Sequence, residues 1–446
     1  MTGYQGGALE AIVVRILRRE FAVAMRLDAA GPVAPITAPR VPCQLYVHVP
    51  FCESLCPFCS FHRVEYREDK SRSYFKSVQR ELRLYRDRGF QFRDVSIGGG
   101  TPTVNPGELL ETIRLIRSFW DIRSLSVETH PNDLTPHVLD GLQSARVDRL
   151  SVGVQSFDDV LLRAMGRVHA HESAAAIVGR LAAARGRFAT LNVDMIFNFA
   201  GQSVQSLERD VAILRELAVD QISFYPLMTA PSAARRMQGS LGAADPARRI
   251  ALYQQILAGL RPHYEPSSAW CFTRASAQSI ARPIDEYITQ SDDYVGVGSG
   301  AFSYVDGRLY STTFSLNRYR ALIEGGASGV TGCRTFTRKQ RMRYDLLVKL
   351  FGLALPYAYI DAKYGRSFRW RMSPELTALR VSGLTRHDPD AIRLTDRGMA
   401  VWIVMMAEFF TAVNAFRDQM RRHIRLEWPG PSASRPTAIA PRRFAS

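Results

Sequence analysis

Short apolar runs alternate with longer amphipathic stretches along the first half of the chain. The runs that fit buried strands are residues 45–49, 94–97, 125–128, 149–154, 191–196 and 221–225. Apolar positions recur at helical spacing in residues 71–88, 106–119, 135–145, 172–185 and 204–217. Strands that alternate with helices build a parallel sheet through right-handed crossovers. The pattern therefore predicts an α/β fold, and six such units fit a partial (β/α)6 barrel.

The two ends of the chain depart from this alternation. Residues 9–27 carry apolar and arginine positions at roughly helical spacing, which predicts an amphipathic helix docked on the domain, with membrane-surface contact as the alternative. Residues 341–353 also predict a helix. The apolar run at 401–407 is interrupted by Glu408 and is too short for a membrane span, so we expect a docked helix there.

The domain organisation follows from these changes in pattern. Proline, serine and alanine dominate the last residues, which predicts a disordered tail. We divide the chain into a lead-in helix at 1–42, a catalytic core at 43–335, a helical C-terminal domain at 336–428 and a tail at 429–446.

Composition favours a soluble cytoplasmic enzyme. The chain has 446 residues with 46% hydrophobic and 22% charged positions, enough for a large core. Its formal charge of +16 comes mostly from scattered arginines without a nucleic-acid-binding module, so we expect no nucleic-acid partner. An anionic substrate or peripheral contact with an anionic membrane surface stays open. Six cysteines are too few for a disulfide framework in so long a chain, which favours a reducing compartment.

Three cysteines form a C-x3-C-x2-C triplet directly after the first predicted strand. They are Cys52, Cys56 and Cys59. Three thiolates from one short loop can ligate three irons of a [4Fe–4S] cluster and leave the fourth iron open to a cofactor. A closed zinc site needs four ligands. The nearby candidates for a fourth ligand are Cys43, His48 and His62. None stands at a usual zinc-pair spacing, so the triplet favours an iron–sulfur cluster over zinc or buried thiols.

Polar and glycine positions mark the ends of the other predicted strands. Three consecutive glycines in residues 98–103 end the second strand and let the backbone approach a ligand closely. Glu128 ends the third strand, Gln155 follows the fourth, and Asp194 lies in the otherwise apolar fifth. Ligands gather at the C-terminal ends of parallel strands. We therefore expect these side chains and the cysteine loop to face one cavity.

The order of these motifs resembles the radical S-adenosylmethionine (SAM) superfamily, and within it the oxygen-independent coproporphyrinogen III oxidase-like family. The segments that carry the resemblance are residues 45–52, 98–103, 127–131, 150–157, 193–196 and 294–303. Similarity covers residues 41–332, and residues 374–398 resemble the family's small winged-helix-like C-terminal domain. The resemblance implies a partial (β/α)6 radical SAM barrel, a [4Fe–4S] cluster, one or possibly two SAM molecules, and a low-potential electron donor such as flavodoxin or ferredoxin.

The resemblance also implies binding residues, although it assigns no catalytic one. Positions that hold the cluster-bound SAM are matched by Tyr46, Gly99, Glu128 and Phe302. Positions around a second SAM in some members are matched by Phe58, Gly100, Thr101, Gln155, Arg167, Asp194 and Met228. Met228 and Phe302 also fit simple core positions, and Arg167 also fits a surface charge.

Residues near the motifs help to distinguish the reactions that different branches of the family carry out. True coproporphyrinogen oxidases of this type usually carry a further cysteine two positions after the triplet, where this chain reads Ser60-Phe61. The heme-associated segment of the heme-chaperone branch is not recognisable in residues 264–272. The residues that match positions around a second SAM are also compatible with a methyltransferase branch of the family. We therefore expect an enzyme that modifies a tetrapyrrole or other planar aromatic substrate, with methyl transfer slightly favoured. Oxidative decarboxylation of coproporphyrinogen III and heme carriage are the alternatives.

Overall fold

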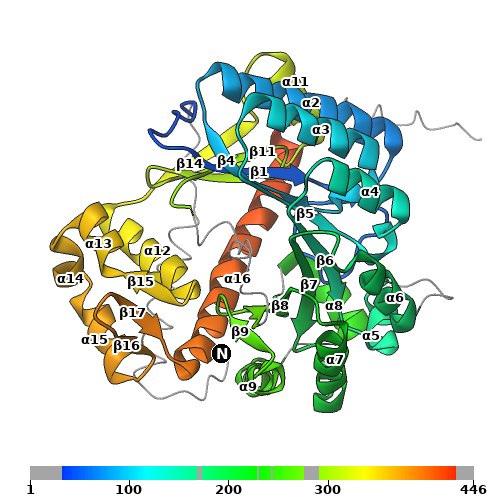
Figure 1. Cartoon of the computed structure of the whole chain (residues 1–446). Coiled ribbons are helices and arrows are strands. Elements are labelled where there is room, and N and C mark those ends of the chain that lie inside the picture. The colour runs from blue at the N-terminus through cyan, green and yellow to red at the C-terminus, as the bar shows by residue number, and fades with distance from the viewer. Residues whose placement is uncertain (1–32, 168–172, 229–230, 243–244, 276–290, 428–446) are drawn as a thin grey trace, which may run out of the picture.

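A 12-stranded mixed sheet forms the centre of the molecule, in the order β14-β13-β12-β11-β1-β4-β5-β6-β7-β8-β10-β9 (Figure 1). The computed structural model describes residues 33–167, 173–228, 231–242, 245–275 and 291–427. The six predicted strands are β1 (Cys43–Val49), β4 (Phe92–Gly99), β5 (Ser124–Thr129), β6 (Arg149–Gln155), β7 (Thr190–Phe197) and β8 (Gln221–Pro226). They lie side by side in sequence order and pair in parallel, so the predicted α/β architecture is confirmed.

The predicted helices pack along the outer side of these strands (Figure 1). They are α2 (Glu68–Asp87), α3 (Pro106–Phe119), α4 (Pro136–Ser144), α6 (Ala174–Ala184) and α7 (Val204–Leu217), with a short α5 (Asp159–Ala164) that the sequence did not predict. Side-chain caps set the starts of α3, α4, α5 and α7. Asn105 accepts from the Glu108 N–H and Thr135 from the Val138 N–H, each before a proline in the first turn.

The sheet continues beyond the predicted strands on both sides. β11 (Tyr294–Val297) pairs in parallel with β1, and β12 (Phe302–Val305), β13 (Arg308–Thr312) and β14 (Val330–Thr335) follow in antiparallel order. On the other side, β10 (Cys271–Arg274) pairs with β8 and then with β9 (Tyr264–Pro266). α8 (Pro231–Leu241), α9 (Arg249–Leu260) and α11 (Leu316–Glu324) lie between these strands in sequence. The sequence missed the added strands because they are short and several are buried on both faces, so no alternation marks them.

A small unit of helices and a three-stranded sheet follows β14. Its elements are α12 (Arg338–Phe351), β15 (Ala354–Pro356), α13 (Tyr357–Tyr364), α14 (Ser367–Arg371), α15 (Ser373–Val381), β16 (Thr385–His387) and β17 (Ala391–Leu394). The strands pair in the order β15-β17-β16. Helices followed by a small antiparallel sheet agree with the winged-helix-like domain that the family resemblance implied.

The last helix, α16 (Asp396–Glu427), returns from this small unit to the large sheet (Figure 1). Residues 396–421 are long and apolar enough to cross a membrane by length and composition, but 72% of the apolar window is buried inside the molecule. The docked helix expected near 401–407 is therefore confirmed. Its expected length was wrong, because Glu408 does not interrupt it and the helix spans 32 residues. The predicted lead-in helix at 9–27 and the predicted tail at 429–446 lie outside the described residues.

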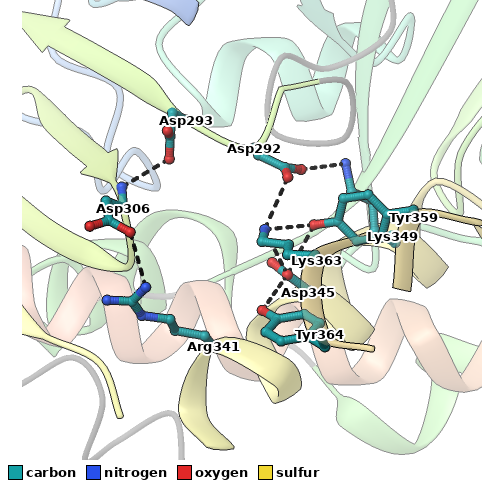
Figure 2. Close-up of polar contacts among 9 residues, drawn as sticks. All are labelled: Asp292, Asp293, Asp306, Arg341, Asp345, Lys349, Tyr359, Lys363 and Tyr364. Carbon is teal, nitrogen blue, oxygen red and sulfur yellow. Dashed lines mark hydrogen bonds and ion pairs between the residues drawn. The ribbon is translucent and has the colours of Figure 1, made fainter. Parts of the chain in front are cut away.

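A polar network connects the small unit to the sheet (Figure 2). Asp345 on α12 is 4% exposed and accepts hydrogen bonds from Tyr359 at 2.9 Å and Tyr364 at 2.6 Å. Lys363 lies 2.8 Å from Asp345 and 3.0 Å from Asp292, which precedes β11. Burial alone would raise the pKa of Asp292, but Lys349 and Lys363 hold this pKa below its usual value. The network therefore connects α12 and α13 to the start of β11 in the large sheet.

Replacing Asp345 by alanine is expected to destabilise the protein by about 3 kcal/mol, because removing one partner of a buried ion pair leaves a desolvated charge. Denaturant unfolding measures the loss. The matched control is Asp306→Ala, since that carboxylate pairs with Arg341 but is 85% exposed, and exposed pairs contribute about 0–1 kcal/mol. Equal effects of the two substitutions would contradict this role for the network.

Candidate functional site

A cavity of about 460 Å³ lies at the C-terminal ends of the parallel strands. This volume falls in the range of roughly 300–1,000 Å³ usual for small-molecule sites. All the residues singled out from the sequence line this cavity: Tyr46, Cys52, Cys56, Phe58, Cys59, Gly99, Gly100, Thr101, Glu128, Gln155, Arg167, Asp194, Met228 and Phe302. The predicted convergence on one cavity is thus observed, while the role of each residue stays a prediction.

Two arginines hold the backbone of the cysteine loop, one from within the loop and one from the last helix. β2 (Phe51–Cys52) and β3 (Val64–Glu65) pair where the loop begins and ends. Arg63 donates to the carbonyls of Cys56 and Cys59 from inside the loop. Arg421 of α16 donates to the carbonyls of Ser60 and Phe61, both at 2.7 Å. These bonds hold the backbone and leave the three partly exposed thiols at the cavity wall.

The donor set fits the cluster better than a zinc ion. Cys43 begins β1 and the triplet follows its end, so a strand of roughly 20 Å separates them. Across the described residues, no group of three or more His, Cys, Asp or Glu side chains is arranged to hold a single metal ion. Thiolates on a [4Fe–4S] cluster each bind a different iron, so they need not converge on one point.

Two histidines behind the triplet have structural partners. His48 hydrogen-bonds with the Tyr46 hydroxyl at 3.0 Å and with the carbonyl of His62 at 2.9 Å. The Nε2 atom of His62 hydrogen-bonds with the Ser299 hydroxyl at 3.2 Å. Burial lowers the pKa of His48 to about 4 and that of His62 well below its usual value, so both rings are neutral. A side chain at Gly99, where φ is +117°, would lie 2.6 Å from the His48 ring.

Glu128 and the glycine run form the next wall of the cavity. The Gly99 N–H donates to the Glu128 carboxylate at 3.0 Å. A Cβ on Gly98 would lie 2.4 Å from that carboxylate, and one on Gly100 would lie 2.5 Å from the carbonyl of Phe51. Glu128 is exposed and lines the cavity, and desolvation by the surrounding protein raises its pKa to about 7. The Glu128 carboxyl group therefore changes between its protonated and ionised forms near neutral pH.

Asp194 is hydrogen-bonded on both oxygens. The Ser151 hydroxyl donates at 2.8 Å and the Asn192 amide at 2.7 Å. Burial raises the pKa of Asp194, while the nearby Arg149 opposes this shift. The sequence singled out Asp194 as a polar residue in an otherwise apolar strand, and the fold itself supplies its hydrogen-bond partners. It still lines the cavity.

Arg167 and Thr101 approach the cysteine sulfurs. The Arg167 guanidinium lies 3.6 Å from the Cys56 sulfur and also donates to the Gly153 carbonyl. The Thr101 hydroxyl lies 3.7 Å from the Cys52 sulfur. Of the two interpretations of Arg167, the structure therefore favours a cavity position over a surface charge.

Sequence reasoning missed the aromatic half of the cavity. Its rings come from β8, the loop before β10, β11, β12, the segment before α12, α12 itself and α16: Tyr225, Trp270, Tyr294, Tyr304, Phe336, Tyr344, Phe409 and Phe410. Trp270 and Phe410 lie 5.5 Å apart, and Tyr304 and Tyr344 4.5 Å apart. These residues are separated by up to 185 positions, so only the fold brings them together. The one sequence signal was the aromatic character of residues 264–272.

Comparison with known proteins agrees with this geometry. The family model described as the radical SAM superfamily matches residues 46–214. The heme chaperone HemW of Bacillus subtilis is 26% identical over 370 residues, covering 79% of this chain and 95% of that protein. The oxygen-independent coproporphyrinogen III oxidase of Escherichia coli is 27% identical over 391 residues, covering 81% of this chain and 83% of that protein. The solved structure of coproporphyrinogen III oxidase (HemN) from Escherichia coli superposes with a TM-score of 0.68 at 22% identity, over 89% of this chain and 93% of that one.

Members of this superfamily use a [4Fe–4S] cluster and SAM. The three thiols at the cavity wall, the Glu128 carboxylate and the glycine run are consistent with both cofactors. Residues 46–214 therefore match the radical SAM superfamily, and the chain as a whole is similar to oxygen-independent coproporphyrinogen III oxidases and to HemW.

Proposed function

We propose that this protein cleaves SAM reductively and uses the product to modify a porphyrin-like or other planar aromatic substrate. The observation that carries the proposal is the division of the cavity. Its polar half holds the cysteines, the glycine run and the carboxylates of Glu128 and Asp194, and its other half is lined by aromatic rings. A polar half suits SAM, while flat apolar walls suit a flat apolar substrate.

The residues of the polar half then have distinct roles. Cys52, Cys56 and Cys59 would hold the cluster, which with SAM supplies the one-electron cleavage that generates a radical able to abstract hydrogen from an unactivated carbon. Glu128 would accept hydrogen bonds from the ribose hydroxyls or the ammonium group of SAM. The aromatic walls would exclude water from the reacting atoms. We also propose that a flavodoxin or ferredoxin in a reducing cytoplasm delivers the electron.

The use that is made of SAM distinguishes the possible reactions on the substrate. Methyl transfer would require a second SAM, for which Gln155, Arg167 and Asp194 are the proposed contacts. Oxidative decarboxylation would use SAM only as the source of the radical, without a methyl donor. The similarity to HemW over 95% of that protein supports heme carriage as a second candidate.

Anaerobic incubation of the cluster-loaded protein with SAM, dithionite and coproporphyrinogen III separates these cases. Mass analysis of the products is the measurement. 5′-Deoxyadenosine with a decarboxylated porphyrinogen indicates the oxidase, and 5′-deoxyadenosine with S-adenosylhomocysteine indicates methyl transfer. Stoichiometric heme binding without turnover indicates a carrier. Absence of 5′-deoxyadenosine under reducing conditions would contradict the enzymatic proposal.

Replacing Asp194 by alanine tests the second SAM. If methyl transfer occurs, this substitution is expected to abolish S-adenosylhomocysteine release while cleavage of the cluster-bound SAM to 5′-deoxyadenosine continues. Ser223→Ala is the matched control, because it removes hydrogen bonds to Asn192 and Asp194 in the same network while the Asp194 carboxylate itself stays at the cavity wall. A stoichiometry of one SAM in equilibrium binding, with unchanged products in the Asp194 variant, would exclude methyl transfer by this route.

A further inference from the structure

Arg63 brings a positive charge to all three cysteines of the triplet. Its guanidinium donates to the main-chain carbonyls of Cys56 and Cys59. Burial raises the pKa of the Cys52 thiol to about 11, and the nearby charge of Arg63 is one of the effects that oppose this rise. Any cluster that the three thiolates hold is therefore close to this guanidinium.

No carboxylate compensates the charge of Arg63 in the part of the chain that the structure describes. There the side chain donates to carbonyl oxygens alone, and its Nη1 atom is buried without a hydrogen-bond partner. Carbonyl oxygens accept hydrogen bonds but carry no net charge. An uncompensated cation that is partly withdrawn from water is costly, because the protein screens charges less than water does. Such a cation suits a negatively charged neighbour.

Arg421 provides a direct contrast on the same loop. It also donates to loop carbonyls, those of Ser60 and Phe61. Its guanidinium, however, lies 2.6 Å from the carboxylate of Asp418, which neutralises the charge. The two arginines thus hold the loop backbone in a similar way, but of the two it is Arg63 that adds uncompensated positive charge.

We propose that Arg63 raises the reduction potential of the [4Fe–4S] cluster and thereby sets how readily the cluster accepts an electron. This inference rests on the proposed reductive cleavage of SAM and adds to it a residue that tunes the electron transfer. Reduction adds one negative charge to the cluster, so a nearby cation stabilises the reduced form more than the oxidised form. Net charge and hydrogen bonds around the cluster are among the factors that set such potentials.

Redox titration of the cluster-loaded protein without SAM tests this role, with the electron paramagnetic resonance signal of the reduced cluster as the measurement. Arg63→Gln is expected to shift the potential by about 59 mV to more negative values, which corresponds to a tenfold smaller equilibrium constant for one-electron reduction. The glutamine amide can still donate to a loop carbonyl, while the charge is lost. Arg63→Lys keeps the charge and is expected to have a potential close to that of the wild type.

Arg421→Gln is the matched control, because the charge that it removes is already paired with Asp418. Its potential is expected to equal that of the wild type. The guanidinium of Arg167, 3.6 Å from the Cys56 sulfur, stays in place in every variant and so contributes equally to each potential.

Iron content and the visible spectrum report whether each variant holds the cluster. Equal potentials in the wild type and Arg63→Gln would show that the inference is wrong, while the proposed function stands. An unchanged potential together with weaker SAM binding would assign Arg63 to SAM instead. Arg63→Met is the second neutral variant, and loss of the cluster in both neutral variants would show that Arg63 serves loop structure and not tuning. If the wild type itself holds no cluster, the proposed function fails together with this inference.

Discussion

Cys56→Ala protein is expected to retain little iron and to show no cleavage of SAM. A [4Fe–4S] cluster in this site depends on three thiolates from one loop, so the loss of one leaves two irons without protein ligands. The loop backbone would stay in place, since Arg63 binds carbonyl oxygens and not the thiol. Iron analysis, the visible absorption of the cluster and 5′-deoxyadenosine release measure the effect. The same result is expected for Cys52 and Cys59.

Cys333→Ala is the matched control, because this cysteine lies in β14 and does not line the cavity. It is expected to keep full iron content and full SAM cleavage. Full iron in the Cys56 variant, or stoichiometric zinc in wild-type protein purified without oxygen, would contradict the cluster assignment.

Glu128→Gln is expected to weaken SAM binding by about 10-fold or more while the cluster spectrum stays unchanged. The ionised carboxylate makes charge-assisted hydrogen bonds of about 1.5–3 kcal/mol, and the neutral amide cannot replace them. Gly98→Ala is a second variant with the charge intact, since its added Cβ would lie 2.4 Å from the carboxylate and displace it. Equal SAM affinity in the wild type and both variants would show that Glu128 does not contact SAM.

The pKa of Glu128 gives this prediction a pH dependence. Desolvation raises that pKa to about 7, so the carboxylate is protonated below pH 7 and ionised above it. Only the ionised form attracts an ammonium group or accepts strongly from ribose hydroxyls. SAM affinity in the wild type is therefore expected to rise as the pH increases from 6 to 8, and Glu128→Gln is expected to lose this rise. Isothermal titration at several pH values is the measurement.

The sequence predicted the polar half of the site far better than the aromatic half. Cys52 and Gly99 follow predicted strands and Glu128 ends one, and the geometry of a parallel sheet brings strand ends together without further information. Trp270 and Phe410 carry no such signal, because an aromatic residue in an apolar stretch fits the core equally well. Their approach depends on α16, whose return to the sheet follows from packing between distant segments. Sequence periodicity describes local structure and does not contain that information.

The bonds from Arg421 to the cysteine loop have a consequence for biosynthesis. Arg421 lies 361 positions after Ser60, so the ribosome completes the loop long before its anchor. At about 5–20 residues per second, this interval is roughly 20–70 s. During that time the nascent loop has its cysteines but not the helix that holds its carbonyls. We expect iron delivery to follow release of the chain, and nascent chains arrested before α16 to retain less iron than the released protein.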